Sequence, residues 1–292
     1  MILNTLVTIA FFLLLYDIFN VYLPEAQNVL NGSFMIALVL YIVSHIVRIF
    51  RLLLLLVEQN SVLGSSVKIH LFSSVVSFIL PFKLGDFVRI SYISVLTGSV
   101  YKGANIVIIE RIFDAFFIFA LILLCLFFNV EIGEFGMLLA TFVTVGIVLF
   151  FLTFFGIHPL CAYIELILLK NSVSKRSLKV IGFLSLLQNI IASLQSQLKL
   201  KGIVLFILTT IIWSLELMTI LIFAQQQIPG LPEALGEAYR YLNSVFTLEN
   251  TNMNYRVISG VGLVLSISTY VVFRQVQKVI RRDFPNKIKS YL

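Results

Sequence analysis

Long apolar stretches dominate this chain, and their lengths predict helices that cross a membrane. A spanning helix needs about 20 predominantly apolar residues, because the hydrocarbon core of a bilayer is about 30 Å thick. The stretches that meet this requirement are residues 2–19, 34–57, 104–128, 135–157, 203–224 and 257–273. The pattern therefore predicts an all-α polytopic membrane protein with about six transmembrane helices.

A further hydrophobic stretch, residues 62–80, carries Lys68 and His70 and is followed by Pro81. Its uninterrupted apolar part is too short to cross a bilayer. We therefore expect a re-entrant or broken segment that enters and leaves the membrane on one side.

The basic residues favour an orientation with both ends of the chain in the cytoplasm, because cytoplasmic loops carry an excess of Lys and Arg. If residues 62–80 are re-entrant, the cytoplasmic loops hold Lys83, Arg89, Lys102, Lys170, Lys175, Arg176, Lys179, Lys199, Lys201, Lys278, Arg281 and Arg282. The far side then holds the basic loop residues Arg240 and Arg256 together with several glutamates. If residues 62–80 crossed the membrane instead, three of the cytoplasmic cations would move outside.

Composition agrees with a membrane protein. With 60% hydrophobic residues, 12% charged residues and a mean hydropathy of +1.03, the chain has too little polar surface for a soluble globule. Basic flanks facing anionic lipid headgroups account for the net charge of +7, so no nucleic-acid partner is expected. The two cysteines and three scattered histidines predict no disulfide framework, metal site or cofactor.

We expect one membrane domain over residues 1–292, with a first half at 1–130 and a second half at 131–292. Residues 2–19 lack a basic start and a cleavage site, so they are expected to remain as the first helix. Within the second half, residues 178–200 mix apolar and amide side chains at helical spacing between lysines. They are predicted to form an amphipathic cytoplasmic helix at the interface. A packed or partner-binding helix is the alternative.

A polar island interrupts the apolar pattern between residues 81 and 114. Its arginines and acids are Asp86, Arg89, Glu110, Arg111 and Asp114. Such residues are costly in lipid and usually have a function or a partner. Pro81 and Gly85 are expected to break the helix here, and freed backbone groups are tolerated only beside protein or water. The island therefore predicts a cavity with Pro81 and Gly85 as a hinge.

The forked guanidinium of arginine suits a phosphate group, so Arg89 and Arg111 are candidate phosphate ligands. Asp86, Glu110 or Asp114 would then hold a cationic or hydroxylated part of a headgroup. The alternative is structural, because Asp86 with Arg89, and Arg111 with Asp114, have the i,i+3 spacing of ion pairs within one helix.

A second stretch repeats the first at the same spacing. Residues 81–89 read P-x-x-L-G-D-x-x-R, and residues 232–240 read P-x-x-L-G-E-x-x-R. The repeat predicts an inverted repeat, whose binding site lies between two halves in many transporters. It adds Pro232 and Gly236 as a second hinge, and Glu237, Arg240 and the following Arg256 as binding candidates.

Other charged residues lie inside predicted spans. His45, Arg48 and Arg51 fall on nearly one face of residues 34–57, where snorkelling to the headgroups would explain both arginines. Arg48 is also kept as a binding candidate. Glu216 lies deep in residues 203–224, so it must pair across helices, become protonated or face water, and we include it as a site candidate.

The string Leu80-Pro81-x-x-x-Gly85-Asp86-x-x-Arg89, followed by Glu110-Arg111-x-x-Asp114, resembles the first-half motif of the flippase-like membrane domain family. That family is named for the transmembrane region of bacterial lysylphosphatidylglycerol synthases. Its usual pattern has Glu where this chain has Asp86, and its glycine-rich second-half motif is only loosely approached here. The resemblance implies a multi-pass protein of the bacterial cytoplasmic membrane.

By this resemblance the chain is expected to be a flippase-like transporter of aminoacylated phospholipid or polyprenyl-phosphate-linked intermediates. Membrane lipids would be its partners, with a separate synthase or glycosyltransferase as a further one. Family synthases carry their transfer chemistry in a soluble domain, for which the 19 residues after Phe273 leave no room. No enzymatic activity is therefore expected.

Two alternatives stay open. One is a non-transporting scaffold or accessory subunit of a lipid- or glycan-modifying enzyme, which a core with every charge paired would favour. The other is a membrane-embedded polyprenyl-phosphate enzyme with Asp86 or Glu110 as base. A polar cavity lined by the arginines would favour transport.

Overall fold

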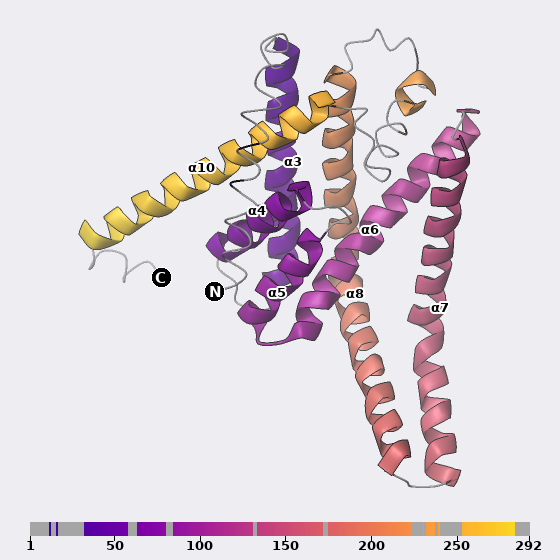
Figure 1. Ribbon diagram of the computed structural model, residues 1–292. Helices are drawn as coiled ribbons and strands as arrows, with labels where there is room; N and C mark the ends of the chain where they lie inside the picture. Colours follow the sequence, from indigo (N-terminus) through magenta and orange to yellow (C-terminus); the bar gives the residue numbers. More distant parts are fainter. Residues whose placement is uncertain are drawn as a thin grey trace.

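The chain folds into long helices that cross one another around a common centre (Figure 1). The computed structural model describes residues 12, 16, 32–57, 63–79, 84–130, 133–171, 175–223, 230, 232–236, 239 and 253–283. The long helices are α3 (Gly32–Leu56), α4 (Leu63–Ile79), α5 (Gly85–Thr97), α6 (Val100–Phe127), α7 (Gly133–Asn171), α8 (Lys175–Phe223) and α10 (Met253–Asp283). No strand occurs in these ranges. The prediction of an all-α membrane protein is confirmed.

Several of these helices are long and apolar enough to cross a bilayer, which makes the chain a multi-pass membrane protein. These stretches are Gly32–Leu56, Gly136–Ile157, Ser177–Lys199 and Lys201–Ile222, and Ile258–Val272 is a shorter apolar helix. Apart from Phe12 and Tyr16, the first predicted span at residues 2–19 lies outside the described residues.

Helix α8 differs from the expectation of a separate interfacial helix at residues 178–200. That segment continues without interruption into the apolar stretch at 203–223, because α8 is one helix of 49 residues with no proline inside it. Its first half packs along α7, where Gln195 Nε2 donates a hydrogen bond to the Phe154 carbonyl oxygen (2.9 Å). Together α7 and this half of α8 form a long hairpin that extends away from the other helices (Figure 1). The packed-helix alternative describes this segment better.

Helices α4 and α5 form the broken segment that the sequence predicts. They have 17 and 13 residues, or about 26 and 20 Å, so each is shorter than the roughly 30 Å hydrocarbon core. Helix α5 ends at Gly98, whose φ of 68° is the left-handed conformation that glycine adopts readily at helix ends. Helix α6 begins two residues later, so α4, α5 and α6 follow one another with short connections.

Gly85 acts through close approach and not through an unusual dihedral angle. Among the described glycines only Gly98 has a positive φ, so Gly85 begins α5 with an ordinary backbone conformation. Gly85 is the first residue of α5 and lies against α4, where a Cβ atom would overlap Ser77 Oγ and the Ser73 carbonyl oxygen. The other predicted hinge residue of this turn, Pro81, lies outside the described residues.

The Gly85→Ala variant is expected to destabilise the protein by about 1–3 kcal/mol, since overpacking forces the backbone of α4 and α5 apart. Thermal unfolding of the purified variant in detergent measures the effect. Gly146→Ala on α7 is the matched control, because nothing lies within 4 Å of its added methyl group. Equal unfolding temperatures for the two variants would contradict the close contact.

Three apolar clusters hold the helices together. The first joins α3, α4, α5 and α10, and the second joins α6, α7, Leu235 and Tyr239. The third joins α3, α4, α5, α6 and α8. Because lipid tails are as apolar as these side chains, helix association in a bilayer depends on close packing and on polar contacts between helices. The ion pairs of the described residues lie among the helices of the third cluster.

Candidate functional site

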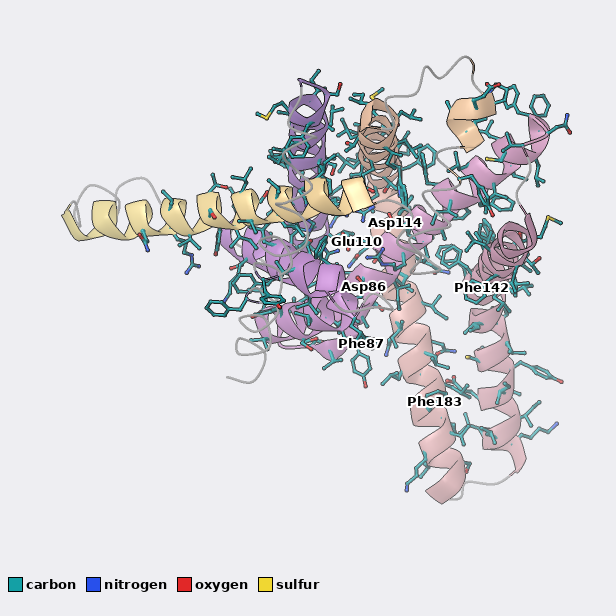
Figure 2. The ribbon with its side chains drawn as sticks, turned by 45° about the horizontal axis from the view of Figure 1, so that its top comes forward. Asp86, Phe87, Glu110, Asp114, Phe142 and Phe183 are labelled. Atoms are coloured by element: carbon teal, nitrogen blue, oxygen red, sulfur yellow. The ribbon has the colours of Figure 1, made fainter. Side chains whose placement is uncertain are left out.

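Eight charged side chains from four helices gather at one place, six in a connected set of ion pairs and two, Arg48 and Glu216, in a further pair beside it. We call these eight side chains the ion-pair network. They are Arg48 and Arg51 of α3, Asp86 and Arg89 of α5, Glu110, Arg111 and Asp114 of α6, and Glu216 of α8. Four arginines face four carboxylates, so the formal charge of the network is zero. Figure 2 shows Asp86, Glu110 and Asp114 together where α5, α6 and α8 meet, while Phe87, Phe142 and Phe183 point outward. The sequence predicted every member as a site residue except Arg51.

Glu110 and Arg51 form the most buried part of the network. The side chain of Glu110 is 1% exposed and accepts a hydrogen bond from Arg89 Nη1, and its other oxygen lies 3.4 Å from Arg51 Nε. Arg51 also donates to Asp114 Oδ1 (2.9 Å) and to Thr209 Oγ1 of α8 (3.0 Å). The expectation that Arg51 snorkels to the membrane surface is therefore wrong, because its partners lie inside the protein.

Arg111 forms the exposed edge of the network. Its Nη1 donates to Asp114 Oδ2 and its Nη2 donates to Asp86 Oδ1, both at 2.8 Å. The side chains of Arg111 and Asp86 are 37% and 21% exposed. The i,i+3 pair of Arg111 with Asp114 is present, whereas Asp86 pairs with Arg111 of α6 and not with Arg89. The reason is that α6 packs against α5 and offers Arg89 the buried Glu110.

Glu216 pairs across helices, which is one of the three outcomes that its sequence position allowed. Arg48 of α3 donates a hydrogen bond to Glu216, whose side chain is 6% exposed. One turn earlier on α8, Trp213 Nε1 donates to Asp114 Oδ1 (3.3 Å), and the indole stacks on Phe117 of α6. The spacing of Thr209, Trp213 and Glu216 places one face of α8 against the network.

Two buried histidines extend the network, although their scattered positions in the sequence did not indicate a site role. His70 Nδ1 lies 2.8 Å from Arg89 Nη2, and His70 Nε2 lies 2.8 Å from His45 Nδ1. A guanidinium only donates hydrogen bonds, so His70 must accept at Nδ1 and carry its proton on Nε2. His70 then donates to His45, which leaves the proton of His45 on Nε2. That buried nitrogen has no hydrogen-bond partner among the described residues.

The described part of the second repeat stretch lies near the C-terminal end of α6, away from the ion-pair network. Residues 232–236 form a short helix in which Pro232 is exposed and Gly236 is buried beside Val130. Cys125 Sγ at the end of α6 lies 3.8 Å from the Leu235 carbonyl oxygen. Cys125 follows Arg111 by 14 positions, or about 21 Å along α6. Glu237, Arg240 and the side chain of Arg256 lie outside the described residues, so their site roles and the inverted repeat stay predictions.

The long apolar helices and their charged centre define a polytopic membrane protein with a buried ion-pair network. The family model for the lysylphosphatidylglycerol synthase transmembrane region matches residues 1–226, and the chain belongs to this family. The match contains every residue of the network and ends before the second repeat stretch. A search of curated proteins and a search of solved structures each found no match.

Proposed function

We propose that this protein binds lipids with a phosphate-containing headgroup and moves them across the membrane. Aminoacylated phospholipids and polyprenyl-phosphate-linked intermediates are the substrate classes. Membership in a membrane-lipid-related family supports the general role. The observation that carries the proposal is the partly exposed pair of Arg111 and Asp86 at the edge of an otherwise buried network.

In the proposed binding step a lipid headgroup replaces the contact between Arg111 and Asp86. The lipid phosphate takes the place of Asp86 on Arg111, whose planar fork matches phosphate oxygens. An ammonium or hydroxyl group of the headgroup then binds the Asp86 carboxylate that Arg111 has released. Because the network carries no net charge, a headgroup with both signs can exchange with an ion pair without leaving an unpaired charge in lipid.

The remaining network residues act as support in this proposal. Arg51 and Arg89 hold Glu110 from two sides, and Asp114 keeps Arg111 in place when Asp86 leaves. No covalent step on the lipid is proposed. The two candidate bases of the enzymatic alternative, Asp86 and Glu110, are both held in ion pairs with arginines.

Arg111→Gln is expected to slow lipid movement at least about tenfold, a loss of about 1.4 kcal/mol of stabilisation. The purified chain is reconstituted in liposomes that contain a fluorescent aminoacylated phospholipid, and bleaching of outer-leaflet label reports transfer. Asp114 keeps Arg51 as a partner and Asp86 is partly exposed, so the variant should fold. Lys170→Gln on α7 removes an exposed charge elsewhere and is the control. Equal rates for Arg111→Gln and the parent would contradict the proposal.

A non-transporting scaffold is the second candidate function, and one observation favours it. Each arginine of the network already has a carboxylate partner in this structure. A scaffold would bind a separate synthase or glycosyltransferase through its helices and leave these pairs closed. The same liposomes decide between the two functions, since a scaffold transfers lipid no faster than liposomes without protein.

A further inference from the structure

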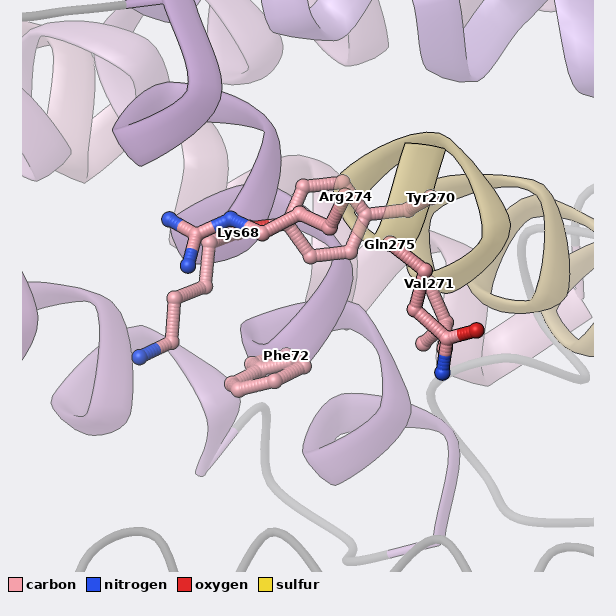
Figure 3. Close-up of a pocket in the computed structure, with 6 residues that line it drawn as sticks. All are labelled: Lys68, Phe72, Tyr270, Val271, Arg274 and Gln275. Atoms are coloured by element: carbon pink, nitrogen blue, oxygen red, sulfur yellow. The ribbon is translucent and has the colours of Figure 1, made fainter. Parts of the chain in front are cut away.

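A cavity between α4 and α10 lies apart from the ion-pair network (Figure 3). Its volume is about 270 Å³, and it is lined by Lys68, Phe72, Tyr270, Val271, Arg274 and Gln275. Lys68 and His70 are two positions apart on α4, which places them about 200° apart around the helix. Helix α4 therefore presents the buried His70 to the network and the partly buried Lys68 to the cavity.

The charge of this cavity is positive. Its two charged lining residues are Lys68 and Arg274, and no ion pair of the described residues involves either of them. Aromatic rings hold both cations. Lys68 Nζ lies 5.4 Å from the ring centroids of Phe72 and Tyr92, and Arg274 Cζ lies 5.8 Å from that of Tyr270. Such contacts orient the side chains and leave their N–H donors available to an anion.

The wall between the cations is partly apolar and partly hydrogen-bonding. Phe72 and Val271 supply apolar surface, and Gln275 supplies an amide. Tyr270 Oη donates a 3.4 Å hydrogen bond to the Gly64 carbonyl oxygen, which ties α10 to α4 at this place. Val271 and Val272 are 45% and 59% exposed, so apolar surface continues outward from the cavity.

We propose that this cavity binds the phosphate headgroup of an anionic phospholipid. Lys68 and Arg274 contact the phosphate oxygens, since a point charge and a planar fork together suit a phosphodiester. Gln275 contacts the hydroxyl or ester oxygens beside the phosphate. The volume is slightly below the roughly 300–1,000 Å³ of sites that enclose whole small molecules. The site therefore holds the headgroup, while the acyl chains lie outside along Val271 and Val272.

The sequence of α10 beyond the cavity supports an anionic lipid surface as the source. Arg274, Lys278 and Arg281 recur at spacings of four and three in the sequence of this helix. Clusters of Lys and Arg next to membrane segments attract anionic lipids. The inference does not depend on the proposed transport function, because the network contributes no residue to this cavity.

Binding of a fluorescent short-chain phosphatidylglycerol to the delipidated full chain in detergent tests the proposal. Phosphatidylcholine with the same chains is the comparison lipid, and sodium phosphate is the competitor. The double variant Lys68→Gln with Arg274→Gln is expected to bind phosphatidylglycerol at least about tenfold more weakly than the parent. The double variant Lys170→Gln with Lys199→Gln loses the same charge at exposed positions outside the cavity and is expected to change binding less than about twofold.

Three results would overturn the proposal. The first is equal binding of phosphatidylglycerol by the cavity variant and the parent, and the second is equal affinity of the parent for the two lipids. The third is competition by sodium phosphate at the same concentration as the lipid, which would make free phosphate the ligand. Binding to this cavity is measured in detergent, whereas the transport proposal is tested by lipid transfer in liposomes. Lipid binding can therefore succeed where transport fails, and the two proposals are tested separately.

Lys68→Arg with Arg274→Lys keeps both charges and should retain most of the binding, which shows that charge and not folding is measured.

Discussion

Glu110→Gln is expected to lower the free energy of unfolding by about 3–5 kcal/mol, because removing one partner of a buried ion pair leaves the others uncompensated. Glu110 is 1% exposed and contacts both Arg51 and Arg89. Glutamine has nearly the same shape, so the packing is kept and the loss reports the charge. The network changes from zero to one positive charge in a region with little access to water.

Titration with a denaturing detergent, followed by circular dichroism, measures this loss for the purified protein. Glu233→Gln is the control, since Glu233 is exposed and outside the ion pairs of the described residues. The control is expected to change stability by less than about 0.5 kcal/mol. Equal losses for the two variants would mean that Glu110 does not hold the arginines together.

Arg48→Met and Glu216→Gln are each expected to cost about 2–3 kcal/mol, and the double variant is expected to cost clearly less than their sum. Either single change removes the opposite charge of this ion pair. The expected cost is below that of Glu110→Gln because the Arg48 side chain is 29% exposed, and water screens it. Residues in direct contact typically show a coupling energy of about 0.5–3 kcal/mol.

The same detergent titration of the parent, both single variants and the double variant gives this coupling energy. Additive losses would show that Arg48 and Glu216 act independently and that Glu216 is stabilised in another way. A large coupling energy would establish that α3 and α8 are joined at this point by charge.

The sequence predicted which residues form the site better than it predicted their partners. The cost of charges in apolar segments was enough to identify Asp86, Arg89, Glu110, Arg111, Asp114 and Glu216. Spacing along one helix suggested a pair of Asp86 with Arg89, because local neighbours are all that a single sequence displays. Apart from Arg111 with Asp114, the ion pairs of the described residues join different helices, as with Arg48 and Glu216, which are 168 positions apart. Only tertiary packing decides such pairs.

Two further differences have local causes. The amide and lysine residues at 195–201 lower the hydropathy of the chain, which suggested an end to one helix and the start of another. Polar side chains alone do not interrupt a helix. Sharp kinks usually occur at proline, and α8 contains none. Glycine is required at position 85, as the sequence indicated. Sequence alone, however, cannot tell whether glycine is needed for its dihedral angles or for a close contact between helices.

The unbroken length of α8 gives the hairpin a mechanical property. Thr209 touches Arg51 in the network, and Lys175 begins the helix 34 positions earlier, or about 51 Å away. A rotation of about 5° around Thr209 would displace that far end by about 4 Å, because α8 transmits a tilt over its whole length. The tip of the hairpin of α7 and α8 therefore moves much farther than the charged centre when α8 tilts.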